Sequence, residues 1–322
     1  MIRSVINMAL PLCGLAISLA VLVAGYLGGV WLPLDVLSHF RLHALAAAVV
    51  FALVAVSGGR LWVPLAAAGL VFFYLAVGFS WLAADKLSSP EGDLRAGERQ
   101  VKLLSFNSWV LNEDLAAIEG LLRAENADVV VMQEFFSQKK PLLDRVADLY
   151  PFQAGCERRI ACSLVVLAKY PIASSEISIL HPRLPVLQAR FGPELAGLTV
   201  VSVHTSRAPW IYEQQAQVAA LARHVAQRKG PLIVAGDFNA TPYSLIFQSF
   251  VRGSGLTGLQ HWPSWPAVPL ALPQLSIDHM FISEGVRPMV SPRPTQPAGS
   301  DHLPVVGQFA ISGQRDRAVA AQ

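Results

Sequence analysis

Residues that can bind a metal ion or transfer a proton recur at the ends of apolar, strand-like runs in the last two thirds of the chain. Six such places occur between residues 101 and 305. One would mean little, because Asp and Asn favour turns after strands, but six are not explained in that way. Strand ends hold side chains on rigid supports at the rim of a sheet, where sites are commonly built. The residues are Asn107, Glu134, His204, Asp237 with Asn239, Asp278, and Asp301 with His302.

This mixture of carboxylates, amides and imidazoles suits the cleavage of a phosphate ester. That reaction needs an in-line nucleophile and neutralisation of charge on the phosphoryl oxygens. Mg²⁺ or Mn²⁺ could supply the charge, because a hard cation takes oxygen ligands and keeps several waters. We expect Glu134 to be the first metal ligand, with Asn107 beside it. His302 is expected to contact the phosphate or move a proton, and Asp278 to hold its far nitrogen and favour its charged form.

The motifs around these residues resemble, in order and spacing, those of the endonuclease/exonuclease/phosphatase family, which has the DNase I-like fold. The resemblance covers roughly residues 99–312, and GDFN (236–239) and SDHLPV (300–305) are its most specific parts. It implies an α/β fold, a four-layer sandwich of two packed mixed sheets flanked by helices. The further motifs are SFN (105–107), QE (133–134), VHT (203–205) and IDH (277–279).

The resemblance also implies roles for individual residues and a divalent cofactor, Mg²⁺ or Mn²⁺. Asp237 would orient or deprotonate the attacking water, and Asn239 would donate to the phosphate. His204 would be a second imidazole on the phosphate, and Asp301 would join the metal network. His279 stays outside the site, because neighbours on a strand point to opposite faces.

Alternating strands and helices are expected to carry these residues. We predict a helix from an N-cap at Asn112 through Glu125, with the acidic Glu113 and Asp114 in its first turn. A second helix is expected over residues 211–227 because it has an apolar stripe at helical spacing. Strands are expected at 101–106, 128–132, 164–167, 186–191, 198–203, 232–235, 277–282 and 305–309.

Three uncharged apolar segments within residues 1–84 predict a membrane anchor, and the chain resembles a membrane-anchored, bacterial-type member of the family. Residues 7–34 and 61–84 contain no Asp, Glu, Lys or Arg, and each exceeds the roughly 20 residues that cross a bilayer. Helices buried in a soluble domain are the alternative. For the first segment the alternative is a cleaved signal peptide, although the apolar run of this segment is longer than that of an ordinary signal peptide. The expected spans are about 8–30, 42–59 and 61–84, followed by a linker (85–98), the catalytic domain (99–312) and a disordered tail (313–322).

We expect an integral inner-membrane protein with its catalytic domain on the periplasmic side. Basic residues flanking the spans do not decide the orientation. Cys156 and Cys162 bracket a short segment and could form a disulfide, which would persist only in an oxidising compartment. Two free thiols are the alternative.

Charge and loop composition bear on the substrate. From residue 91 onward, basic and acidic residues are almost balanced, whereas enzymes acting on nucleic acid usually have a basic face. We therefore expect hydrolysis of a phosphodiester or phosphomonoester, of a lipid or nucleotide, at the membrane surface. An exported nuclease acting on DNA or RNA is one alternative. A catalytically silent, tethered binding module is another, but it would be expected to lack Glu134, Asp237 or His302, and all three are present.

Two further features leave alternatives open. The segment 253–276 is rich in Pro, Trp and Leu; we favour an ordinary apolar cover over a loop that faces the membrane. Arg207 and Trp210 follow His204 closely and are candidates for the substrate entrance, or ordinary surface residues.

Overall fold

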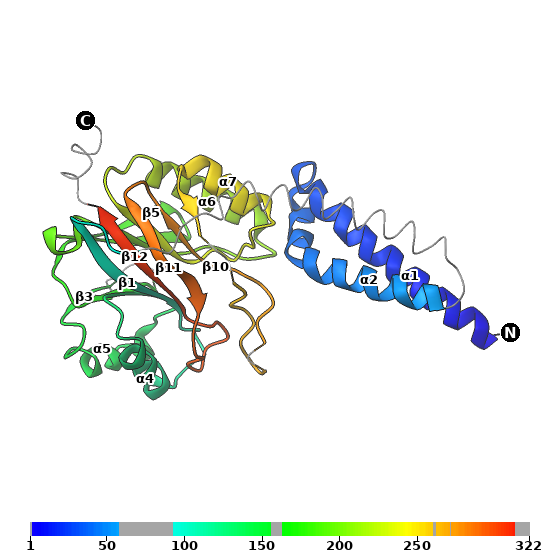
Figure 1. Ribbon diagram of the computed structural model, residues 1–322, viewed down its shortest axis with the longest axis horizontal. Coiled ribbons are helices and arrows are strands. Elements are labelled where there is room, and N and C mark those ends of the chain that lie inside the picture. Colours follow the sequence, from blue (N-terminus) through cyan, green and yellow to red (C-terminus); the bar gives the residue numbers. More distant parts are fainter. Residues whose placement is uncertain (1, 58–92, 156–162, 260–261, 271, 313–322) are drawn as a thin grey trace. The chain divides into compact units, whose positions relative to one another are not determined.

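The computed structural model describes residues 2–57, 93–155, 163–259, 262–270 and 272–312 (Figure 1). The chain forms two compact units, Met1–Leu87 with Tyr243–Ile246, and Ser88–Pro242 with Phe247–Gln322. Four sequence-based expectations lie outside the described residues: the span at 61–84, most of the 85–98 linker, the Cys156–Cys162 pair and the tail 313–322.

The described part of the first unit is helical. It comprises α1 (Ile2–Tyr26), two 3₁₀ segments (Leu27–Gly29 and Leu32–Phe40) and α2 (Arg41–Ser57). The helices α1 and α2 lie side by side (Figure 1), with Leu15, Ala48 and Ala55 buried together. Two stretches, Leu10–Gly29 and Leu32–Ala55, are long and apolar enough to cross a membrane, a test that a signal sequence or the core helix of a soluble protein also passes. Two of the three expected spans therefore correspond to helical segments.

Two six-stranded mixed sheets form the second unit. The first has the order β11-β12-β1-β2-β4-β3 and the second the order β5-β6-β7-β8-β10-β9. The pairs β1–β2 and β7–β8 are parallel, and the other pairs are antiparallel. The strands are β1 (Glu98–Asn107), β2 (Val129–Gln133), β3 (Phe152–Gly155), β4 (Val165–Ala168), β5 (Ile172–His181), β6 (Leu184–Phe191), β7 (Thr199–His204), β8 (Leu232–Asp237), β9 (Thr257–Gly258), β10 (Asp278–Ile282), β11 (Val286–Pro294) and β12 (Val305–Ser312).

The alternation of side chains along the strands divides the apolar residues between two layers. Val129 and Val131 of β2 point into a core that also contains Ile233 and Met280 of the second sheet. Val130 and Met132, on the opposite face, pack against α4 (Leu115–Glu125). A strand covered on both faces must be apolar at every position, which explains the unbroken apolar run in β2.

Helices cover the outer faces of both sheets (Figure 1). On α6 (Ile211–Ala226), Val218, Leu221, Ala222 and Val225 are buried, so the expected stripe is confirmed. On α7 (Leu245–Ser254), Phe250 packs against Phe238 and against Phe281 of β10. The expected sandwich of two packed mixed sheets with flanking helices is therefore observed, and a short helix α5 (Pro141–Arg145) follows α4.

The predicted N-terminus of the first catalytic-domain helix is wrong by two residues. The N-cap is Asp114, whose carboxylate accepts a hydrogen bond from the backbone N–H of Ala117. Asn112 is buried, and its side chain donates to the carbonyl of Ala298 instead. Glu113 and Asp114 therefore precede the helix and do not lie in its first turn.

Candidate active site

Strand order and register bring the predicted residues to one end of the two sheets. The parallel pair β1–β2 places Asn107 opposite Gln133, next to Glu134. The parallel pair β7–β8 places His204 opposite Asp237. Strand β10 runs antiparallel to β8, so its first residue, Asp278, lies opposite Asp237. Four strands thus end, and one begins, where the polar side chains lie.

Asp237 depends on the glycine that precedes it. Gly236 has φ +149°, and a Cβ atom there would lie 1.9 Å from the carbonyl oxygen of Val203 on the neighbouring strand. No other residue fits so close an approach of two backbones. The glycine of the GDFN motif is therefore required to bring β8 beside β7 and to place Asp237 next to His204.

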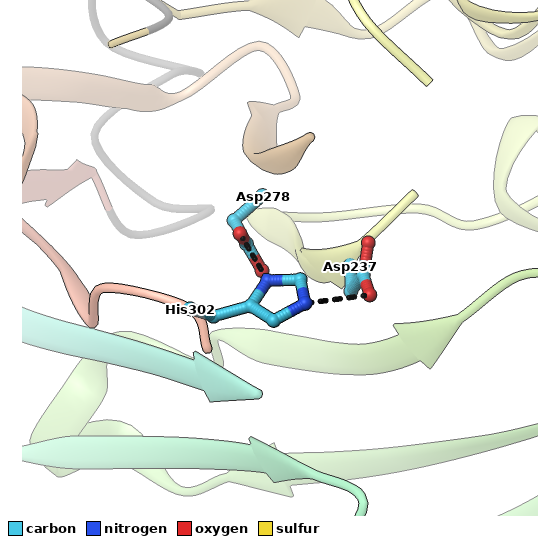
Figure 2. Close-up of side chains that lie close together, drawn as sticks. All are labelled: Asp237, Asp278 and His302. Atoms are coloured by element: carbon cyan, nitrogen blue, oxygen red, sulfur yellow. Dashed lines mark hydrogen bonds and ion pairs between the residues drawn. The ribbon is translucent and has the colours of Figure 1, made fainter. Parts of the chain in front are cut away.

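His302 lies between two buried carboxylates (Figure 2). Its Nδ1 lies 2.8 Å from Oδ2 of Asp278, and its Nε2 lies 3.7 Å from Oδ2 of Asp237. Burial alone would lower the pKa of His302, but the carboxylates of Asp278 and Asp237 outweigh it and raise the pKa to about 10. The ring is therefore an imidazolium at neutral pH, and the expected partnership of Asp278 with the far nitrogen is present.

We expect the imidazole of His302 to remain protonated up to about pH 10, and its pKa to fall when Asp278→Asn removes the hydrogen-bonded carboxylate. Long-range ¹H–¹⁵N NMR spectra of histidine-labelled protein report the protonation state directly. His279 is an internal control, because burial lowers its pKa to about 4 and keeps it neutral across the same range. A wild-type His302 signal that titrates near pH 6.5 would contradict the assignment.

Asn107, Glu134 and His204 surround the other side of Asp237. The Nδ2 of Asn107 donates to Oδ2 of Asp237 over 2.9 Å and to Oε1 of Glu134 over 3.3 Å. The Nε2 of His204 lies 3.5 Å from Oδ2 of Asp237 and 3.8 Å from Oε1 of Glu134. These three residues thus lie in one cluster with Asp237 and His302, as expected from their positions at strand ends.

Asn239 turns back towards Asp237. It has φ +48°, and its backbone N–H donates to Oδ1 of Asp237 over 2.8 Å. Its side-chain nitrogen donates to Oδ2 of Asp237 over 3.1 Å and to the carbonyl of Thr205 over 3.0 Å. Asn239 therefore fixes both oxygens of the Asp237 carboxylate.

Asp301 lies at the edge of the cluster, beside the loop that contains Ser264 and Trp265. None of the family motifs includes this loop. Its Oδ1 is 4.0 Å from Nε2 of His302, and its Oδ2 accepts a hydrogen bond from Nε1 of Trp265 over 3.1 Å. Ser264 donates to Oδ2 of Asp278 over 2.6 Å. Ser264 and Trp265 thus orient two acids of the site. The sequence of their uncharged, Pro- and Trp-rich segment did not predict this role.

Two sets of side chains offer ligands for a metal ion. Ligand atoms of Asp237, Asp278 and His302 lie within 4.8 Å of one another, so this group could hold an ion. Both ring nitrogens of His302 face carboxylates, however, and an imidazolium has no lone pair for a metal. Oxygen donors suited to Mg²⁺ remain on Glu134 and on Asp301, whose enclosed Oδ1 accepts no hydrogen bond from the described residues.

Within the described part of the chain, no side-chain hydrogen bond or ion pair joins Arg207 or Trp210 to the cluster. Arg207 and Trp210 are exposed, and the Trp210 ring lies 5.6 Å from the guanidinium of Arg183. His279 is buried with its Nε2 2.7 Å from the carbonyl oxygen of Ala240 and its ring against Phe247. The His279 ring therefore packs against an aromatic side chain, on the face of β10 opposite to that of its neighbour Asp278.

Comparisons with known proteins agree with this architecture. The Endonuclease/Exonuclease/phosphatase family model matches residues 104–302. The endonuclease/exonuclease/phosphatase from Beutenbergia cavernae DSM 12333 is 21% identical with a TM-score of 0.54, covering 67% of this chain and 72% of that one. No curated protein matches the chain.

Two further solved structures share the fold. Sphingomyelinase C from Streptomyces griseocarneus is 18% identical with a TM-score of 0.51, covering 66% of this chain and 99% of that one. D. rerio TDP2 complexed with single strand DNA product is 17% identical with a TM-score of 0.54, covering 65% and 98%. The family comprises hydrolases of phosphate esters that generally depend on a divalent metal ion. Since the family model spans more than half of the sequence, the chain belongs to the endonuclease/exonuclease/phosphatase family.

Proposed function

We propose that this protein hydrolyses a phosphodiester or phosphomonoester by in-line attack of water, with Mg²⁺ or Mn²⁺, at a membrane surface. The observation that carries the proposal is the contact chain from Glu134 through Asn107 and Asp237 to His302, with neighbouring polar atoms 2.9–3.7 Å apart. It combines a buried carboxylate, an imidazolium and metal-capable oxygens, which are the parts that phosphoryl transfer requires.

Asp237 is the proposed general base that orients and deprotonates the attacking water. Burial raises the pKa of its carboxyl, although the positive charge on His302 opposes the shift. A base whose pKa lies closer to the working pH transfers protons more effectively. Both side-chain N–H groups of Asn239 are engaged, so its first role is to hold Asp237, and donation to the phosphate would require one of these bonds to be given up.

His302 and His204 are the proposed contacts to the phosphoryl oxygens. The imidazolium of His302 carries the positive charge that a developing phosphorane needs, and Asp278 keeps it charged and oriented. Glu134, Asn107 and Asp301 would hold the metal ion, which when bound supplies positive charge to the phosphoryl oxygens and the leaving group.

A substrate panel tests the proposal. Phospholipids, nucleotides, and single- and double-stranded DNA are incubated with the full chain in detergent, with Mg²⁺, with Mn²⁺, or with a chelator. Metal-dependent hydrolysis of a lipid or nucleotide ester is the expected result. Preferential cleavage of DNA would favour the nuclease alternative, and the absence of any chelator-sensitive hydrolysis would favour a silent binding module.

The segment beside Asp278 and Asp301 favours a lipid substrate. No Asp, Glu, Lys or Arg occurs between Arg252 and Asp278, and Trp262, Leu270 and Leu272 are 51%, 73% and 64% exposed. An uncharged surface with large exposed apolar side chains suits contact with a membrane interface, where Trp is favoured. We therefore propose that this segment faces a membrane, in contrast to the ordinary apolar cover that the sequence favoured.

The double variant Leu270→Ser/Leu272→Ser is expected to lower hydrolysis of a phospholipid in vesicles roughly tenfold or more, because burial of one leucine contributes about 1.5–3 kcal/mol. Turnover of a soluble diester such as bis(p-nitrophenyl) phosphate should not change. Ile179→Ser is the control, since Ile179 is similarly exposed (50%) but lies on β5. Equal losses on both substrates would argue against a membrane-facing loop.

A further inference from the structure

Lys139 is an unusual residue because its side chain is fully buried. It ends a 3₁₀ turn, Ser137–Lys139, shortly after β2, and its exposed fraction is 0%. Lysine is almost never fully buried unless its ammonium group is paired. Among the described residues no carboxylate lies within ion-pair distance of its Nζ, which instead donates to two carbonyl oxygens, those of Trp109 (2.7 Å) and Glu134 (3.2 Å).

Both carbonyl partners have a left-handed backbone. Trp109 has φ +55° and Glu134 has φ +52°, a conformation that L-residues other than glycine adopt at a cost. A conformation of this kind persists only when the surroundings hold it. One ammonium group therefore binds the carbonyls of two strained residues, one after each of the neighbouring strands β1 and β2.

The left-handed turns also determine where the proposed metal ligands lie. The N–H of Trp109 donates to Oδ1 of Asn107 over 3.0 Å. The N–H of Val110 donates to Oε2 of Glu134 over 2.6 Å, and the exposed side chain of Gln138 donates to the carbonyl of Val110 over 2.9 Å. The loops after β1 and β2 thus form one connected unit whose side chains at the site are Asn107 and Glu134.

We propose that Lys139 is a positioning residue for the metal site, which clamps the carbonyls of Trp109 and Glu134 so that Asn107 and Glu134 hold their oxygens ready for a cation. The inference rests on the proposed function, because it takes these two residues as ligands. The ammonium group contacts the backbone and not the Glu134 carboxylate. Each carboxylate oxygen accepts one hydrogen bond, from Val110 or Asn107, and keeps lone-pair capacity for a metal ion. Three N–H donors on a compact group suit a clamp between two carbonyls.

The test measures Mn²⁺ binding by electron paramagnetic resonance, without substrate, on the full chain in detergent. Lys139→Met is expected to weaken Mn²⁺ binding about 10- to 100-fold, as when other residues that orient metal ligands are removed. The turnover of a soluble diester at saturating Mn²⁺ should change much less than the metal affinity. Lys140→Met is the matched control, because the neighbouring Lys140 is exposed, and it should bind Mn²⁺ like the wild type.

Each alternative outcome has one meaning. A folded Lys139→Met variant with wild-type Mn²⁺ affinity but a lower Tm would show a merely structural lysine and overturn the inference, while the proposed function would stand. A wild type that binds no Mn²⁺ would overturn both. If Lys139→Met does not fold, Gln138→Ala is measured instead, since it removes a second bond between the two loops at an exposed side chain. Weaker Mn²⁺ binding in that variant supports the clamp, and unchanged binding overturns it.

Discussion

The Asp237→Asn variant is expected to lose phosphoesterase activity while keeping its fold. Asparagine has the same shape as aspartate but cannot accept a proton, and removal of a general base typically costs about 10²–10⁴-fold in kcat. Oδ1 of residue 237 could still accept the backbone N–H of Asn239. His302 would keep its shorter contact, the 2.8 Å bond to Asp278, so the imidazolium would not be left without a carboxylate.

The measurement is kcat for a soluble diester at saturating Mg²⁺ or Mn²⁺, together with Tm as a check of the fold. Asp144→Asn is a suitable control, because Asp144 lies exposed on α5 and the same change there should affect neither quantity. Turnover at the wild-type level in Asp237→Asn would remove Asp237 from the proton-transfer step and leave it a structural role beside Asn107.

The site could be predicted from the sequence because each of its residues marks the end or start of a buried strand. Apolar runs such as 129–132 and 232–235 are recognisable without a structure, and the polar residue that follows each run must lie at the sheet rim. The pairing of β7 with β8 puts His204 beside Asp237. This pairing cannot be deduced from the apolar run of either strand alone. The resemblance implied two packed mixed sheets but no strand order, so this pairing was not predicted.

Other elements gave no periodic signal. Strand β5 is an edge strand whose residues, IASSEISILH, are all exposed or half-buried, so it lacks the apolar run of a central strand. Strand β11 contains three prolines and register shifts, and proline within a run argues against a strand even though edges tolerate it. Both strands were missed for these reasons, although the central strands on either side of the site were found.

Local rules also failed where a tertiary contact decided between similar residues. Asn112 and Asp114 are both good N-cap residues, and Asp114 takes the cap because Asn112 is buried against Ala298. The contributions of Lys139 and Ser264 depend on loops that meet the site from other parts of the chain. Residues that support a site through such contacts cannot be recognised from spacing, whereas residues at strand ends can.

Replacing His302 with alanine is expected to lower stability as well as activity. At pH 7 the variant would leave the buried carboxylates of Asp237 and Asp278 without the imidazolium between them, a change that typically costs about 3–5 kcal/mol. For a domain of this size we expect Tm to fall by roughly 6–20 °C. Thermal unfolding of the full chain in detergent, followed by tryptophan fluorescence, measures the shift.

The pH dependence distinguishes this loss from a simple packing defect. The folded-state pKa of His302, about 10, lies above its ordinary value of 6.5, so its stabilisation is complete below pH 6.5 and disappears as the pH rises through 10. The difference in Tm between wild type and His302→Ala should therefore shrink from pH 7 to pH 10. His279→Ala is the matched control, because His279 is equally buried but neutral over this whole range, and its deficit should stay constant. A deficit in His302→Ala that is as large at pH 10 as at pH 7 would mean that the ring contributes packing and not charge.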